Sequence, residues 1–225
     1  MTDGEMIMSL AEQLEAMSVG SAKRIPEEAR AVMMKAAQEL DAQGIGDKAL
    51  SVGDPFPEVG LQGPDGGDVD LSSLLSKGPM LINFYRGGWC PYCNLELKAY
   101  QDELETVRSL GAELVAISPE TPDRAEATAA KNEISYPVLT DPQNSLAEAL
   151  GIVFTLPPEL AKLYEMFGNN LPEAHGEAGW RLPIPATYVV GKDGVILYAH
   201  IGRDYRTRAE PEDAIAALRA PQAAA

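Results

Sequence analysis

Two cysteines three positions apart carry the clearest chemistry in this sequence. Cys90 and Cys93 are the only cysteines among 225 residues, and they follow the apolar run Met80–Tyr85 in the order Trp-Cys-Pro-Tyr-Cys. Pro91, directly after Cys90, is typical of the first turn of a helix. The N–H groups and dipole at a helix N-terminus stabilise a thiolate and can lower a cysteine pKa from about 8.5 to between about 3.5 and 7.5. We therefore predict redox chemistry, with Cys90 and Cys93 as the catalytic residues.

Other uses of two cysteines fit this spacing less well. A disulfide that closes a two-residue gap constrains the unfolded chain very little. Zinc needs three or four ligands, and His175 and His200, the only histidines, are far away in the sequence and are expected at the surface or at a strand end. An inert pair of cysteines is the alternative. We predict no metal and no other cofactor.

Composition narrows the location and the partners. The formal net charge of −16 repels phosphate backbones and argues against nucleic-acid binding. No run of about eighteen apolar residues predicts a membrane span, and the start Met1–Glu5 does not resemble a signal peptide. A chain with only two cysteines fits a reducing compartment, so we expect it in the cytoplasm.

The first fifty residues differ from the rest. Apolar residues recur there at helical spacing in two stretches, namely Ile7, Leu10, Leu14 and Met17, and then Ala29, Val32, Met33, Ala36, Ala37 and Leu40. We predict an N-terminal helical extension over 1–50, a main domain over 51–220 and a tail over 221–225. The apolar faces of the extension are expected to pack on the chain's own core rather than on another subunit.

From Val52 onward, strand and helix patterns alternate and end in a hairpin, which predicts a three-layer α/β/α domain with a mixed central sheet. Strands are predicted at 80–85, 113–118, 136–140, 186–190 and 195–200. Helices are predicted from the cysteines to Gly111, at 122–132, after 141–142 and at 211–219. Between about 155 and 180 prolines and glycines accumulate, which predicts an irregular insertion.

Several motifs resemble the thioredoxin-fold superfamily and, within it, the alkyl hydroperoxide reductase/thiol-specific antioxidant (peroxiredoxin) family. Val52–Pro57 resembles the family's G-x-x-x-P-x-F opening, Tyr136–Pro142 its F-P-V-L-S-D-P segment, and Ala149–Ile152 its A-Y-G-V continuation. The resemblance runs from about Val52 to Leu218. It implies an α/β thioredoxin-like fold, to which the N-terminal helices are added.

The catalytic motif differs from the family's in two places. Cys93, followed by Asn-Leu-Glu-Leu, stands at the peroxidatic position of Thr-x-x-Cys, with Cys90 in place of the threonine. Pro185 stands in place of the arginine of Arg-x-Thr-Phe. Both changes resemble thioredoxin, whose Trp-Cys-x-x-Cys lies opposite a cis-proline. The resemblance thus implies a cis Ile184–Pro185 bond that faces the dithiol and binds substrate, with Trp89 shielding the sulfurs.

Two enzymatic functions follow. The leading hypothesis is a thiol-disulfide oxidoreductase in redox homeostasis, in which Cys90 is the exposed attacking thiolate of lower pKa and Cys93 resolves. The alternative is a peroxidase of hydrogen peroxide or organic hydroperoxides, in which Cys93 attacks and Cys90 resolves. It ranks second because the two helper residues are missing and one such donor can contribute about 10²–10³ in rate. Arg86 or Arg181 would have to substitute for the missing arginine.

A third hypothesis is non-enzymatic, a redox sensor whose dithiol changes binding through the N-terminal helices. The expected partners are a thiol reductant or disulfide substrate protein of the thioredoxin or glutathione type, a small hydroperoxide, and a second copy of the chain in a homodimer.

Overall fold

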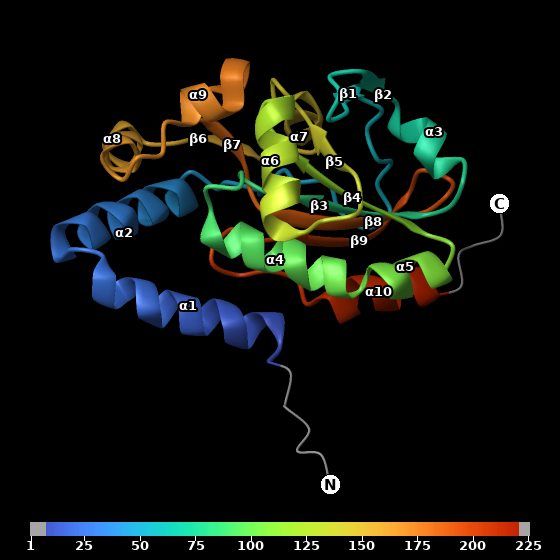
Figure 1. Cartoon of the computed structure of the whole chain (residues 1–225), viewed down its shortest axis with the longest axis horizontal. Coiled ribbons are helices and arrows are strands. Elements are labelled where there is room, and N and C mark those ends of the chain that lie inside the picture. The colour runs from blue at the N-terminus through green and yellow to red at the C-terminus, as the bar shows by residue number, and fades with distance from the viewer. Residues whose placement is uncertain (1–7, 221–225) are drawn as a thin grey trace, which may run out of the picture.

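A seven-stranded mixed sheet forms the centre of the computed structural model, which describes residues 8–220 (Figure 1). The strand order is β2-β1-β5-β4-β3-β8-β9. Neighbours β3, β4 and β5 are parallel, and β8, β9 and β1 pair antiparallel with their neighbours. The strands are β1 (Leu61–Gln62), β2 (Asp68–Val69), β3 (Met80–Phe84), β4 (Glu113–Ser118), β5 (Val138–Thr140), β8 (Ala186–Val190) and β9 (Ile196–Ile201).

Strand β3 lies in the middle of the sheet and is buried on both faces. Leu81 packs into the hydrophobic cluster on one side of the sheet, and Ile82 and Phe84 pack into the cluster on the other side. A strand buried on both faces has a continuous apolar run instead of an alternating pattern. This explains the run that the sequence shows directly before the cysteines.

Helices cover both faces and complete the three-layer α/β/α fold, so the predicted fold class is confirmed. One face carries α4 (Pro91–Asp102), α5 (Leu104–Ser109), α6 (Pro122–Asn132) and α10 (Pro211–Arg219), and the other carries α3 (Leu71–Leu75) and α7 (Ser145–Ala149). The helix expected from the cysteines to Gly111 is divided at Glu103 into α4 and α5.

The N-terminal extension forms two helices, α1 (Leu10–Arg24) and α2 (Glu27–Ala42). Figure 1 shows α1 alongside α4, and α2 alongside α8 (Pro158–Met166). Leu10 and Leu14 are buried in the same cluster as both cysteines, so the extension packs on the chain's own core, as expected. Ile7, the first residue of the predicted apolar face, lies outside the described residues.

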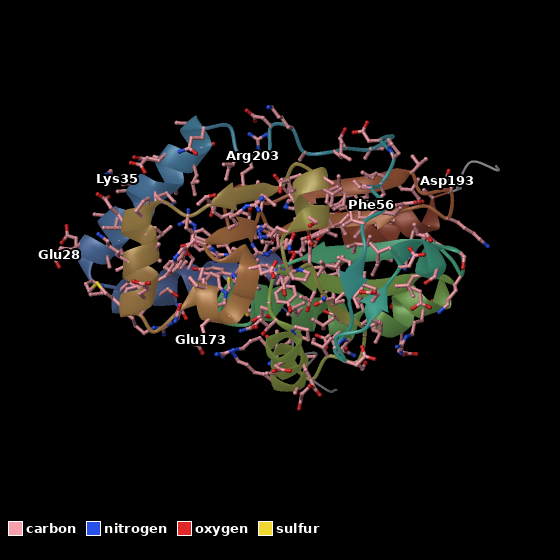
Figure 2. All side chains as sticks on the ribbon, turned by 90° about the horizontal axis from the view of Figure 1, so that it is seen from above. Glu28, Lys35, Phe56, Glu173, Asp193 and Arg203 are labelled. Atoms are coloured by element: carbon pink, nitrogen blue, oxygen red, sulfur yellow. The ribbon has the colours of Figure 1, made fainter. Side chains whose placement is uncertain are left out.

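The extension lies at the end of the sheet where β3 leads to the cysteines. Figure 2 shows Glu28 and Lys35 of α2 at one end of the molecule and Asp193, in the turn between β8 and β9, at the other end. Because Val190, just before this turn, pairs with Met80 at the start of β3, the carboxyl end of β3 points toward the extension. Among the described residues, no helix has the length and apolar character needed to cross a bilayer.

The segment predicted to be an irregular insertion is ordered, so that prediction was wrong. Strands β6 (Val153–Thr155) and β7 (Arg181–Pro183) form an antiparallel pair at its base. Between them lie α8, α9 (Leu171–His175) and a 3₁₀ turn, Gly176–Ala178. The prolines that suggest irregular structure in the sequence stand in the first turns of the two helices, where proline is tolerated because no N–H donor is required.

The predicted cis bond between Ile184 and Pro185 is also wrong, because every peptide bond among residues 8–220 is trans. The chain runs in an extended conformation from β7 into β8, and the residue before a proline favours this conformation. The Ile184 N–H donates to the Ile152 carbonyl at 2.6 Å, and the Pro185 carbonyl accepts from the Gly202 N–H at 2.8 Å. These two backbone groups are therefore not free to pair with an extended substrate.

We predict that Gly151→Ala destabilises the fold more than Gly111→Ala, as measured by denaturant unfolding. Both glycines have a left-handed backbone (φ +73° and +72°), but a β-carbon at Gly151 would lie 2.5 Å from the Lys48 carbonyl oxygen, whereas Gly111 faces open space. Each variant should lose about 1–2 kcal/mol from backbone strain. Gly151→Ala should lose about 1–3 kcal/mol more from the clash. Equal losses would contradict the contact between the end of the extension and the main domain.

Candidate active site

Cys90 lies where the loop after β3 enters helix α4. It is the N-cap residue of α4, and Pro91 occupies the first turn, so the predicted placement at a helix start is confirmed. The Cys90 side chain makes no capping hydrogen bond within residues 8–220. Both cysteines are free thiols with no solvent exposure. The expectation that Cys90 is exposed was therefore wrong, and the dithiol is buried under neighbouring side chains.

Each sulfur accepts a hydrogen bond from a buried arginine. Arg86 Nη2 lies 3.0 Å from Cys90 Sγ, and Arg208 Nη2 lies 3.3 Å from Cys93 Sγ. Arg86 is one of the two arginines considered from the sequence. The other, Arg181, forms an ion pair with Glu148 at 2.6 Å in which both side chains are partly exposed. Arg208 was not identified from the sequence, because 115 residues separate it from Cys93.

Arg208 is held by groups from two elements. Its Nε binds the Glu96 carboxylate of α4, and its Nη1 donates to the carbonyls of Tyr205 and Thr207, both at 2.6 Å. The Arg208 and Glu96 side chains are both almost fully buried. Burial raises the pKa of Glu96 to about 7 despite the opposing charge of Arg208. These bonds orient the guanidinium toward Cys93.

Arg86 is surrounded by aromatic rings. Its guanidinium lies 4.9 Å from the centre of the Trp89 ring and 4.5 Å from that of Tyr205, distances at which a cation is attracted to an aromatic face. Arg86 Nη1 lies 3.5 Å from the hydroxyl of Tyr164 in α8. Trp89 therefore lies over the arginine that binds Cys90, and its shielding of the two sulfurs stays a prediction.

The two thiols titrate as a coupled pair. Burial alone would raise both pKa values. The pKa of Cys90 instead lies well below its usual value, because the neighbouring Cys93 thiol and the positive charges of Arg86 and Arg208 stabilise its thiolate. Burial and the neighbouring Cys90 thiolate hold the pKa of Cys93 well above its usual value. These opposite shifts favour the thiolate at Cys90 and the protonated thiol at Cys93.

A buried carboxylate holds the loop that leads to Cys90. Glu120, after β4, accepts hydrogen bonds from the Gly88 N–H and from the hydroxyls of Tyr85 and Thr128, each at 3.0 Å. A β-carbon at Gly88 would lie 2.1 Å from the Thr128 hydroxyl oxygen, so this close approach requires glycine. Glu120 was not identified from the sequence, because its partners lie in the loop after β3 and in α6, which are far apart from each other in the sequence.

His175 is buried, contrary to expectation. It ends α9, and its Nε2 accepts a hydrogen bond from Trp89 Nε1 at 3.2 Å. Burial lowers the pKa of His175 to about 4, so the ring is neutral at physiological pH. The segment between β6 and β7 therefore reaches the surroundings of Cys90, because its Tyr164 contacts Arg86 and its His175 contacts Trp89. His200 lies near the end of β9 and is partly buried.

Comparison with known proteins points to one family. The model of the AhpC/TSA family matches residues 52–199. A chloroplastic peroxiredoxin Q of Gentiana triflora is 29% identical over 65% of this chain, and this match spans 57% of that protein's length. The chloroplastic peroxiredoxin Q of Triticum aestivum is 28% identical over 84% of this chain and 74% of its own length.

Solved structures show the same fold. A peroxidoxin from Mycobacterium tuberculosis aligns with a TM-score of 0.61 at 24% identity, covering 77% of this chain and 99% of that one. AhpC from Enterococcus faecalis aligns with a TM-score of 0.57 at 19% identity, covering 75% and 90%. At these identities the likeness supports the fold alone.

We predict that acid destabilises this protein partly through His175. The neutral ring is favoured in the folded state, where its pKa is about 4 against 6.5 for an ordinary histidine. Its contribution to stability is therefore present above pH 6.5 and is lost as the pH falls toward 4. Between pH 7 and 4 the free energy of unfolding should fall by about 3 kcal/mol more in the native protein than in His175→Gln, measured by urea titration. The same pH dependence in both proteins would contradict the buried neutral histidine.

Proposed function

Because this chain belongs to the AhpC/TSA family, and is on that ground an oxidoreductase, we propose that it is a thiol peroxidase that reduces hydrogen peroxide or organic hydroperoxides. One observation supports this proposal above all: each buried sulfur accepts a hydrogen bond from an arginine. From the sequence alone, the peroxidase hypothesis ranks second because the family's threonine and arginine are absent. Arg86 and Arg208 supply donors from other positions, so this objection no longer applies.

Cys93 is the proposed attacking sulfur, because it stands at the family's peroxidatic position and contacts Arg208. In the reduced pair the proton is favoured on Cys93 and the negative charge on Cys90. In the first step Cys90 accepts this proton. The Cys93 thiolate then attacks the terminal oxygen of the peroxide, an S–O bond forms and the O–O bond breaks. The leaving alkoxide or hydroxide takes the proton from Cys90 and departs as an alcohol or as water.

The arginines stabilise the negative charge that develops on the leaving oxygen. Arg86 Nε is buried and has no acceptor among the described residues, which leaves this N–H available to a peroxide oxygen. Donors placed in advance inside a site with little water are effective, because they do not need to reorganise during the reaction. Neither sulfur is exposed, so the side chains that cover the dithiol must move before a peroxide can enter.

Resolution follows within the same motif. Cys93 is now a sulfenic acid, and Cys90 is again a thiolate. The Cys90 sulfur attacks Cys93, a disulfide forms, and the hydroxide that leaves is protonated to water. Two external thiol groups, from one thioredoxin-type dithiol or from two glutathione-type monothiols, then reduce the disulfide and are themselves oxidised to a disulfide. Cytoplasmic location and a homodimer stay predictions.

We predict a division of roles that rapid mixing with hydrogen peroxide and with cumene hydroperoxide will test. Cys93→Ser should neither consume peroxide nor form sulfenic acid. Cys90→Ser should consume one equivalent and retain a sulfenic acid at Cys93 that dimedone traps. Arg208→Lys should lower the second-order rate constant by about 10²-fold.

Arg181→Lys is the matched control and should leave the rate unchanged, because Arg181 pairs with Glu148 at the surface. If Cys93→Ser consumed peroxide and Cys90→Ser did not, Cys90 would be the attacking residue. If the native protein reduced glutathione disulfide but no peroxide, the oxidoreductase hypothesis would replace the proposed function.

A further inference from the structure

The N-terminal extension contacts the surroundings of the dithiol although it precedes residues 52–199, the part that matches the family. Leu10 and Leu14 of α1 share a hydrophobic cluster with Cys90 and Cys93, and α1 packs along α4, the helix that starts at the dithiol. On the other side α2 packs on α8, which carries Tyr164, a contact of Arg86. The extension thus touches elements on both sides of the site.

The closest connection is a carboxylate that binds the start of α1. Glu210 accepts hydrogen bonds from the backbone N–H groups of Leu10 at 3.2 Å and Ala11 at 2.7 Å. The next N–H, of Glu12, is satisfied by the side chain of Ser9. Since a helix start has several N–H groups without partners and a positive dipole end, a carboxylate there is stabilising. Glu210 is the N-cap of α10 but makes no capping bond to its own helix.

Glu210 ends the segment 202–210 between β9 and α10, which we call the arginine loop. Arg208 of this loop donates to Cys93, and its Nη1 binds two carbonyls of the same loop. Tyr205 of the loop also stacks on Arg86, the donor to Cys90. The conformation of the arginine loop therefore determines the position of Arg208 directly, and it determines the position of Arg86 through the Tyr205 ring.

We propose that Glu210 is a positioning residue that connects the N-terminal extension to the reactivity of the dithiol. By binding the first turn of α1, it holds the arginine loop against the helix that packs on α4. The loop in turn keeps the two guanidinium groups on the sulfurs. The extension then helps to keep Arg86 and Arg208 in contact with the two sulfurs. This inference rests on the proposed function only in taking Cys93 as the reacting sulfur.

The test uses the full chain with Cys90→Ser, so that Cys93 is the only thiol, and follows its alkylation by iodoacetamide against pH. The midpoint of this profile reports the pKa of Cys93, and the plateau at high pH reports access to the sulfur. Adding Glu210→Ala should move the midpoint upward by about one unit, because Arg208 lies less firmly on Cys93. At a pH below both midpoints the alkylation rate relative to the plateau should then fall about tenfold.

Glu15→Ala is the matched control, since it removes a carboxylate from an exposed position of α1. The Glu15 carboxylate makes no hydrogen bond or ion pair within residues 8–220. Its midpoint should equal that of the parent. Glu210→Gln, which keeps one acceptor oxygen, should give an intermediate midpoint and serves as the test variant if Glu210→Ala does not fold.

A higher plateau with an unchanged midpoint would mean that Glu210 only limits the access of iodoacetamide to Cys93. This result would overturn the inference. Equal midpoints for the Glu210 and Glu15 variants would also overturn it. Because no peroxide is used, the two proposals fail separately. A protein without peroxidase activity whose midpoint still shifted would contradict the proposed function and leave this inference standing.

Discussion

One negative charge in a buried pair of thiols, favoured on Cys90 rather than on Cys93, is the feature on which the rest of this site depends. Placing a thiolate away from water is costly unless cations and hydrogen-bond donors replace the lost solvation. Arg86 and Arg208 provide both, and each lies on one of the sulfurs. The arginines are themselves buried charges, so each needs further partners. The Glu96 carboxylate supports Arg208, and the rings of Trp89 and Tyr205 surround Arg86.

Several separate parts of the fold position the cysteines and the residues that stabilise the thiolate. The central strand β3 and helix α4 place the cysteines at the carboxyl end of the sheet. Glu120 holds the loop between them through Gly88, while the segment between β6 and β7 adds Tyr164 and His175 to the cover. The arginine loop supplies Arg208 and Tyr205, and Glu210 joins this loop to the N-terminal extension. Much of the chain outside the sheet thus serves to keep one thiolate stable in the interior.

The sequence correctly predicted the helices and strands whose ends depend on local signals. Helix α6 runs from Pro122 to Asn132 as expected, because a proline in the first turn marks its start, and β4 matches the expected 113–118. The predicted cis bond at Pro185 was wrong because it was transferred from thioredoxin, whereas here the backbone at this position is determined by the pairing of β7 with β6 and of β8 with β3 and β9. Arg208, Glu120 and His175 were missed because their roles come from contacts between distant segments. Arg86 was predicted only as a candidate, since spacing alone does not show which arginine faces a sulfur.

The number of thiolates in the reduced native protein can be counted from their absorbance near 240 nm as the pH is raised, and this count tests whether the buried pair holds a single negative charge. The two cysteines are the only ones in the chain, so the signal comes from this pair once tyrosine ionisation is subtracted with the double serine variant. We predict that one thiolate per chain has formed well below the usual thiol pKa of about 8.5 and that the second forms only well above it. Two thiolates that form together near pH 8.5 would contradict it.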